Sequence, residues 1–90
     1  MWLFRFTVEA EIDFARLDKG IQARVAERLR WFVRNFEHVI PLPLGGQWSG
    51  FFKIRVGDWR VIYETKSDSK TIVVHLIDHR GRIYKRKPTL

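Results

Sequence analysis

Three cations close to one predicted turn are the residues of this sequence best suited to chemistry. Lys53 and Arg55 alternate on one predicted strand, and Arg60 lies on the next, beyond Gly57-Asp58. Glycine at the first position suits a type II′ turn of two residues, which fixes the register of a hairpin. In that register Arg55 faces Arg60, and Lys53 lies diagonal to Arg60. Such a group on a rigid sheet could clamp a phosphodiester, because an arginine can hold two of its oxygens at once.

This register places two positive charges opposite each other, which lowers stability, and we interpret it as a sign of function. Like charges that face each other across a sheet are destabilising, by on the order of a few tenths of a kcal/mol. Local rules of this kind tend to be broken at functional sites. The alternative interpretation is an edge hairpin that basic side chains keep soluble. The apolar side chains of the two strands share the opposite face, which we assign to the core: Phe52, Ile54, Val56, Trp59, Val61 and Tyr63.

A second cluster follows the last predicted strand and combines phosphate-binding groups with groups that can move protons. Its members are Asp78, His79, Arg80, Arg82, Tyr84, Lys85, Arg86 and Lys87. The alternative interpretation is a solvent-exposed basic tail. Alternation cannot tell which of these side chains point toward Lys53 and Arg55, because the end of a strand often bends. His75 lies within the strand itself, and we interpret it as a packed or surface histidine rather than a catalytic one.

The elements that must position these groups begin with a strand and a helix. Residues 2–8 alternate in character, which indicates a strand with one buried face. Residues 9–17 predict a short helix. The acids near its start, where the helix dipole favours negative charge, are Glu9, Glu11 and Asp13. Gly20 interrupts helical character, so we expect a turn near Asp18.

A second helix and a loop follow. The helix carries an apolar stripe at helical spacing, which consists of Ile21, Val25, Leu29, Phe32, Val33 and Phe36. The two helices predict a helical hairpin packed on a sheet. Residues 37–49 contain two prolines and two glycines, which favours a loop. Its apolar residues either tuck into the core or form a protein-docking patch: Val39, Ile40, Leu42, Leu44 and Trp48.

The rest of the chain predicts an antiparallel meander. Residues 51–56 and 59–65 form the hairpin described above, and the polar stretch 66–70 makes the next turn. Residues 71–78 are β-branched and apolar, which predicts the most buried strand. A strand, a helical hairpin and a three-stranded meander together indicate an α+β fold.

Composition narrows the function further. The net charge is +7, and residues 50–90 hold ten Lys and Arg against four Asp and Glu, whereas residues 1–49 hold seven against six. This asymmetry suggests a polyanionic partner. The absence of cysteine excludes disulfides and thiolate metal sites and favours a reducing cytoplasm. No apolar run approaches a membrane span, no signal peptide is evident, and the acids are too scattered to predict a metal site.

The run from Phe52 to Glu64 resembles the central hairpin of the RelE/ParE toxin superfamily. Asp78-His79-Arg80, followed by Tyr84, resembles the C-terminal signature of the RelE branch. The resemblance covers essentially the whole chain and implies a single domain over residues 1–90. It also implies a RelE-like α+β fold, in which the helices pack on one face of a four-stranded sheet.

The resemblance implies the toxin of a type II toxin–antitoxin system. RelE-like members are metal-independent endoribonucleases that cleave messenger RNA in the ribosomal A site. The ribose 2′-hydroxyl attacks the adjacent phosphate and leaves a 2′,3′-cyclic phosphate and a 5′-hydroxyl. We therefore expect no cofactor, a cytoplasmic location, and as partners a cognate antitoxin, the ribosome and messenger RNA. Operator DNA would be bound only through the antitoxin complex, and a membrane is not expected as a partner.

Matching to the family's motifs assigns the site. The matched catalytic positions are Lys53, Arg55, Arg60, Arg80 and Tyr84. Arg55 replaces what is often lysine, which preserves phosphate binding but not proton transfer, since guanidinium does not deprotonate in proteins. Arg60 and Arg80 would stabilise the pentavalent phosphate, and Lys53 or Tyr84 would take the 2′-proton. The RNA-binding residues would be His79, Arg82, Lys85, Arg86 and Lys87; His79 is also an acid/base candidate, ranked below Tyr84.

Two other functions remain open at this point. A ParE-like inhibitor of DNA gyrase would share the fold without nuclease activity. A non-catalytic RNA-binding module would bind RNA through the same basic face and leave it uncut.

Overall fold

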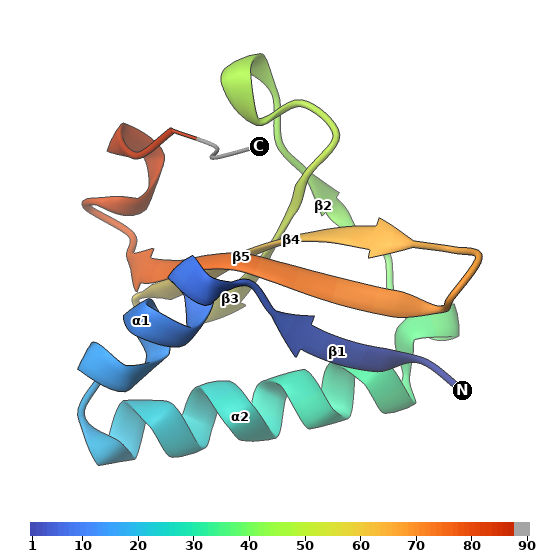
Figure 1. The fold of residues 1–90 in the computed structure, drawn as a ribbon, viewed down its shortest axis with the longest axis horizontal. Helices are drawn as coiled ribbons and strands as arrows, with labels where there is room; N and C mark the ends of the chain where they lie inside the picture. Colours follow the sequence, from blue (N-terminus) through green and yellow to red (C-terminus); the bar gives the residue numbers. More distant parts are fainter. Residues whose placement is uncertain (88–90) are drawn as a thin grey trace.

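The computed structural model describes residues 1–87 (Figure 1). Its helices and strands are β1 (Leu3–Phe6), α1 (Val8–Arg16), α2 (Lys19–Arg34), β2 (Leu42–Pro43), β3 (Phe52–Val56), β4 (Trp59–Lys66) and β5 (Thr71–His79). Three short 3-10 helices are η1 (Phe36–His38), η2 (Gly46–Trp48) and η3 (Ile83–Lys85). Within this part of the chain, no helix has the length and apolar character needed to cross a membrane.

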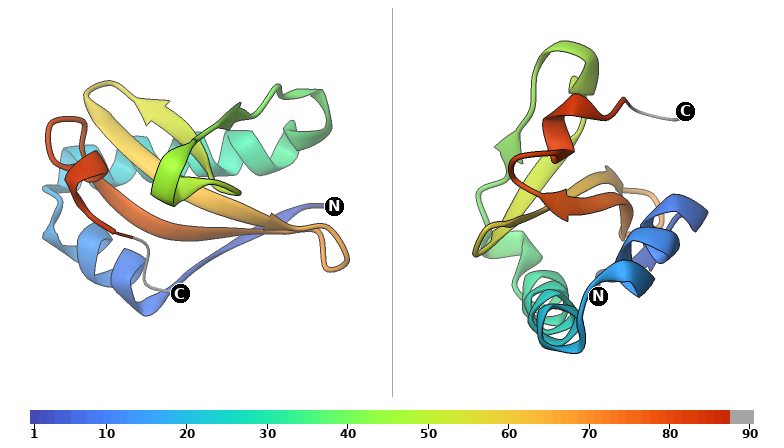
Figure 2. Two further views of the ribbon diagram at one scale, coloured as in Figure 1. Left: turned by 90° about the horizontal axis from the view of Figure 1, so that it is seen from above. Right: turned by 90° about the vertical axis from the view of Figure 1, so that its left-hand side faces the viewer.

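The strands form one sheet in the order β1-β5-β4-β3-β2. β1 runs parallel to β5, and the other neighbours are antiparallel. Figure 2 shows both helices against one face of the sheet and the segments around η2 and η3 on the other. The predicted α+β architecture, with helices packed on one face, is confirmed.

The sheet has five strands rather than the predicted four, because β2 adds to its edge. Leu42 pairs with Lys53, and Pro43 pairs with Phe52. Proline is tolerated on an edge strand, where its missing N–H is not needed for a ladder. A strand of two residues leaves no alternation in the sequence, so the predicted loop 37–49 gave no sign of it.

Side-chain caps set the beginnings of both helices. The Thr7 hydroxyl accepts a hydrogen bond from the Ala10 N–H, and the Asp18 carboxylate accepts one from the Ile21 N–H. These are the contacts that N-cap residues make. The predicted turn at Asp18 is confirmed, but Gly20 lies inside the first turn of α2 and does not interrupt it.

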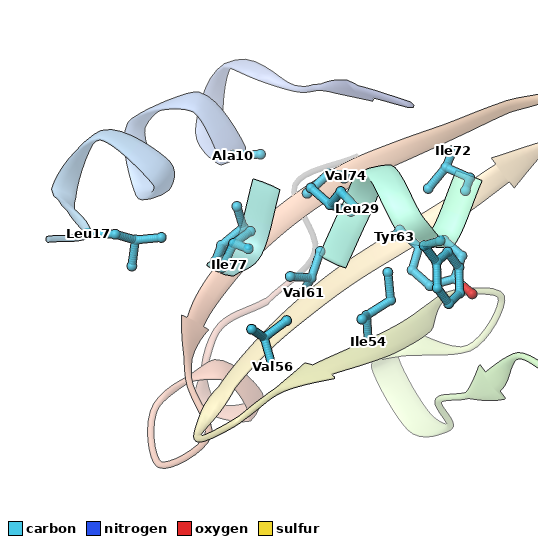
Figure 3. Close-up of a cluster of buried hydrophobic side chains, with 12 residues drawn as sticks. Ala10, Leu17, Leu29, Ile54, Val56, Val61, Tyr63, Ile72, Val74 and Ile77 are labelled. Carbon is cyan, nitrogen blue, oxygen red and sulfur yellow. The ribbon is translucent and has the colours of Figure 1, made fainter. Parts of the chain in front are cut away.

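The main core lies between the helices and the sheet, as Figure 3 shows. Val25, Leu29 and Phe32 of the predicted stripe are buried there, and its other members pack against the same cluster. All the hairpin residues assigned to the core face belong to this cluster or contact it. The alternation in β3 and β4 therefore predicted the buried face correctly.

A second, smaller core covers part of the opposite face. Its buried members are Trp48, Phe51, Ile62, Leu76 and Ile83. Of the two interpretations of loop 37–49, packing into the core is confirmed for three residues, and protein docking at the exposed residues stays a prediction. Trp48 is buried, Leu44 packs against the second core and Val39 against the main core, whereas Ile40 is 85% and Leu42 is 39% exposed.

Candidate nucleic-acid interface

The hairpin of β3 and β4 has the predicted register. All five predicted pairs are present, including Arg55 opposite Arg60 and Val56 opposite Trp59. Gly57 has φ +59°, whereas Asp58 has no positive φ, which fits the expected type II′ turn. Paired residues of adjacent strands point to the same side of a sheet, so the two arginines share a face.

Arg55 and Arg60 both lie free of acidic partners within residues 1–87. Arg55 is exposed. Arg60 is half-buried, and its Nη1 donates to the carbonyl oxygens of Gly57 at 2.8 Å and Trp59 at 2.9 Å. These two bonds hold the Arg60 guanidinium close to the turn without neutralising it. The pair therefore presents two uncompensated positive charges on one face, which suits a phosphate.

Asp78 is the acid that could have neutralised Arg60. It lies directly opposite Arg60 in the pairing of β4 with β5. Its carboxylate instead accepts hydrogen bonds from Arg82 Nε at 3.1 Å and Arg86 Nη1 at 3.2 Å. The charge of Asp78 is thus already compensated by the C-terminal segment, which leaves Arg60 available to an anion.

Tyr84 reaches the hairpin because the chain turns back after β5. Ile83, its neighbour in η3, is fully buried in the second core. The Lys53 ammonium lies over the Tyr84 ring, 5.8 Å from the ring centroid to Nζ. Tyr84 is 41% exposed and Lys53 is half-buried, so both remain open to a ligand. The structure thus brings together two sequence-predicted site residues whose relative placement alternation could not decide.

Arg80 lies at the turn of the hairpin. Its backbone N–H donates to the Asp58 carbonyl at 2.8 Å, and its Nε is 3.6 Å from the Asp58 carboxylate. Both side chains are more than half exposed. Exposed ion pairs of this kind contribute little and exchange readily, so a phosphate could replace Asp58 as the partner of Arg80.

The two histidines of β5, His75 and His79, do not lie beside Lys53 as Tyr84 does. His79 pairs with Trp59, and its ring packs edge-on against that indole, which belongs to the helix side of the sheet. It lies away from Arg60, while its Nδ1 accepts the Gly81 N–H. His75 contacts the Glu64 carboxylate at 2.6 Å and packs against Phe51. The interpretation of His75 as a packed residue is confirmed.

The basic segment after β5 is folded rather than a solvent-exposed tail as far as residue 87. Lys85 and Lys87 are exposed. Arg82 is also exposed, although it pairs with Asp78. Arg86 differs, because its guanidinium contacts three acids and is largely covered. We therefore set Arg86 apart from the residues that would bind RNA.

Asp13 is the residue whose role the sequence did not reveal. Its place in the sequence predicts an acid at a helix start, but it is buried, and the acids in the first turn of α1 are Glu9 and Glu11. Its carboxylate accepts the Ile77 N–H at 3.0 Å and Arg86 Nη1 at 2.9 Å. Its spacing along the chain carried no signal, since its partners come from β5 and the C-terminal segment.

The pKa shifts of this region follow from its ion pairs. Burial alone would raise the pKa of Asp78, but hydrogen bonds from the His79 N–H, Arg82 and Arg86 outweigh it and lower the pKa. Burial alone would lower the pKa of Arg86, but its contacts with Asp13 and Asp78 raise it. Asp78 and Arg86 therefore stay ionised at neutral pH.

Comparison with known proteins gives the family. Residues 4–84 match the sequence model of a family described as the ParE toxin of the type II toxin–antitoxin system parDE. The toxin RelG of Mycobacterium tuberculosis is 32% identical over 82 residues, which cover 91% of this chain and 94% of that protein.

Solved structures agree in fold. A chain of the toxin–antitoxin complex RelBE2 from Mycobacterium tuberculosis aligns with a TM-score of 0.78 at 31% identity, covering 88% of this chain and 98% of that chain. The isolated RelE toxin of E. coli aligns with a TM-score of 0.74 at 15% identity, covering 94% and 93%, a likeness of the fold alone. The chain therefore belongs to the RelE/ParE family of toxins from type II toxin–antitoxin systems.

Proposed function

We propose that this toxin is a metal-independent endoribonuclease that cleaves messenger RNA in the ribosomal A site. The observation that carries the proposal is the facing pair Arg55 and Arg60, which share one face of the sheet without an acidic partner among the described residues. Tyr84 and Lys53 contact each other beside this pair. The group offers phosphate binding and a proton acceptor on one surface.

In the proposed reaction the ribose 2′-oxygen attacks the adjacent phosphorus. Its proton passes to Lys53 in the neutral amine form or to Tyr84 in the phenolate form, and the bond from phosphorus to the 5′-oxygen breaks. The leaving oxygen takes up a proton from water, so the products are a 2′,3′-cyclic phosphate and a 5′-hydroxyl. Arg60 stabilises the negative charge that develops on the phosphate oxygens. Arg80 gives up its contact with Asp58 and stabilises the same charge. Arg55 binds the phosphate but moves no proton.

RNA binding and an antitoxin partner complete the proposal. The exposed cations Arg82, Lys85 and Lys87 follow the RNA backbone near the reacting phosphate. A cognate antitoxin binds the toxin, as the toxin–antitoxin complex RelBE2 suggests by similarity. His79, on the helix side of the sheet, has at most a peripheral place in the RNA contact.

A second candidate function is inhibition of DNA gyrase, which the ParE description of the matching family favours. Induced expression in a bacterial host separates the two. The ribonuclease should stop protein synthesis first and leave message fragments with 5′-hydroxyl ends. Induction of a DNA-damage response with intact messages and continuing translation would instead support the gyrase inhibitor and reject the ribonuclease.

A further inference from the structure

Arg86 connects the C-terminal segment to two other parts of the fold. Its Nη1 is 2.9 Å from the Asp13 carboxylate of α1 and 3.2 Å from the Asp78 carboxylate of β5, and its Nη2 is 3.6 Å from Glu9. Asp13 is 7% and Asp78 is 17% exposed. Ion pairs that are partly withdrawn from water are screened less than surface pairs. The contacts of Arg86 are therefore suited to holding a chain segment in place.

The backbone of residue 86 is anchored as well. Its carbonyl oxygen accepts the indole N–H of the buried Trp48 at 3.2 Å and the amide of Gln47 at 3.3 Å. Three residues earlier, Ile83 is fully buried in the second core. Tyr84 thus lies between a hydrophobic anchor at Ile83 and a polar anchor at Arg86. Figure 2 shows this segment folded back over the sheet beside the segment of η2.

We infer that Arg86 is a positioning residue, whose contacts with Asp13 and Asp78 hold residues 81–87 on the sheet and so keep Tyr84 beside Lys53. The inference rests on the proposed function only for its consequence in catalysis. The placement of Tyr84 can be tested without any RNA. Its catalytic consequence is that a loosened segment moves Tyr84 away from the reacting phosphate, and small displacements of a reacting group are costly.

The charges around Arg86 argue against a direct contact with RNA. The three acids Glu9, Asp13 and Asp78 face it, and Arg16 and Arg82 line a hollow of about 480 Å³ with it. The positive charge of Arg86 is therefore already compensated by these carboxylates. The hairpin face, with Arg55 and Arg60 free of acids within residues 1–87, differs in this respect.

The chain has two tyrosines, which makes fluorine NMR a direct readout. With 3-fluorotyrosine incorporated, Tyr63 reports on the main core and Tyr84 on the C-terminal segment. In Arg86→Gln the Tyr84 signal should move to the position seen in the denatured protein, while the Tyr63 signal stays in place. Arg86→Lys should show an intermediate shift. Arg16→Gln, which removes a cation from the same hollow, should leave both signals unchanged.

Cleavage kinetics give the second readout. Arg86→Gln should lower kcat by about tenfold or more, in line with the cost of a misplaced group, while KM changes less than about twofold. Arg16→Gln should cleave like the wild type. A Tyr84 signal that stays in place in Arg86→Gln would overturn the inference, whereas a displaced signal with unchanged kcat would overturn its catalytic consequence. A rise in KM alone would also overturn it, because it would assign Arg86 to RNA binding.

The two readouts also distinguish a loss of Tyr84 positioning from a folding defect and from a failure of the proposed function. Removing Arg86 leaves Asp13 buried without its counter-charge, which can unfold a small domain. If Arg86→Gln also loses the native Tyr63 signal, Asp13→Asn/Arg86→Gln takes its place, since it lacks both charges, with the same outcomes for Tyr84. If wild-type toxin cuts no RNA, the proposed function fails, and the Tyr84 signal still decides whether Arg86 positions the segment.

Discussion

The Lys53 ammonium lies 5.8 Å above the ring of Tyr84, although the two residues come from the central hairpin and from the C-terminal segment. The contact joins the two basic clusters of the sequence into one surface. Because Tyr84 remains 41% exposed, the pair does not close the surface to a ligand.

Loss of the proton acceptor should slow cleavage without weakening RNA binding. Positioned acid/base groups typically contribute about 10²- to 10⁴-fold. Of the two variants Tyr84→Phe and Lys53→Gln, the one that removes the proton acceptor should lose kcat in this range. Its KM should stay nearly unchanged. Single-turnover cleavage of a ribosome-bound message measures it. Tyr63→Phe is the matched control for the tyrosine change. Rates within twofold of wild type for both site variants would exclude both residues as the acceptor.

Salt dependence tests the exposed cations of the C-terminal segment. Removing a cation that binds one phosphate should reduce the slope of log K against log salt by about 0.7 for single-stranded RNA. We therefore expect a shallower slope for Lys85→Gln/Lys87→Gln, measured by titration of a short RNA at several salt concentrations. Lys19→Gln, at the start of α2 on the helix side, should keep the wild-type slope. An unchanged slope in the double variant would remove both lysines from the interface.

The buried hydroxyl of Tyr63 should lower the stability of the fold. Its hydroxyl is buried and has no hydrogen-bond partner in the part of the chain that the structure describes, and burial raises its pKa. A buried hydroxyl without a partner carries a desolvation cost of about 1 kcal/mol or more. Tyr63→Phe should therefore unfold at the same or a higher denaturant concentration. A loss of more than about 1 kcal/mol would show that the hydroxyl has a stabilising contact.

The contacts of the Glu64 carboxylate should make the stability of the fold depend on pH. Burial alone would raise its pKa, but hydrogen bonds with Lys66 and His75 outweigh it and lower the pKa. Its contacts therefore stabilise the fold fully above the ordinary Glu value of about 4.3. That contribution is lost as the pH falls through the lower folded value.

The variant Glu64→Gln isolates this contribution. It should be less stable than the wild type at pH 7, and the difference should shrink as the pH falls below about 4. Denaturant unfolding at a series of pH values measures both proteins. Glu27→Gln, an exposed acid on α2, should show no such trend. A difference between Glu64→Gln and wild type that is equal at pH 3 and pH 7 would contradict the assignment.

The sequence predicted the hairpin well because a two-residue turn leaves little freedom. Once Gly57-Asp58 made the turn, alternation decided the face of every residue from Phe52 to Tyr63, and the structure has that arrangement. The stripe of α2 was predicted for a similar reason, since helical spacing defines one face. β5 was also correctly expected to be deeply buried.

The features that the sequence did not predict depend on contacts between distant parts of the chain. The strand β2 has two residues and thus no pattern. The burial of Asp13 requires α1 to pack on β5 and the C-terminal segment to return over the sheet edge. The approach of Tyr84 to Lys53 requires Ile83 to enter the second core. Alternation and helical spacing describe single elements, so none of these contacts could be predicted from them.

Arg60 gives the most direct test of the central claim. The assay uses ribosomes programmed with a defined message, wild-type toxin, Arg60→Ala and the control Lys70→Ala, and it maps the ends of the fragments. The wild type and the control should cut the message and leave 2′,3′-cyclic phosphate and 5′-hydroxyl ends, while Arg60→Ala, folded by circular dichroism, should leave it intact. Cutting by Arg60→Ala at the wild-type rate, or no cutting by the wild type, would contradict the proposed ribonuclease site.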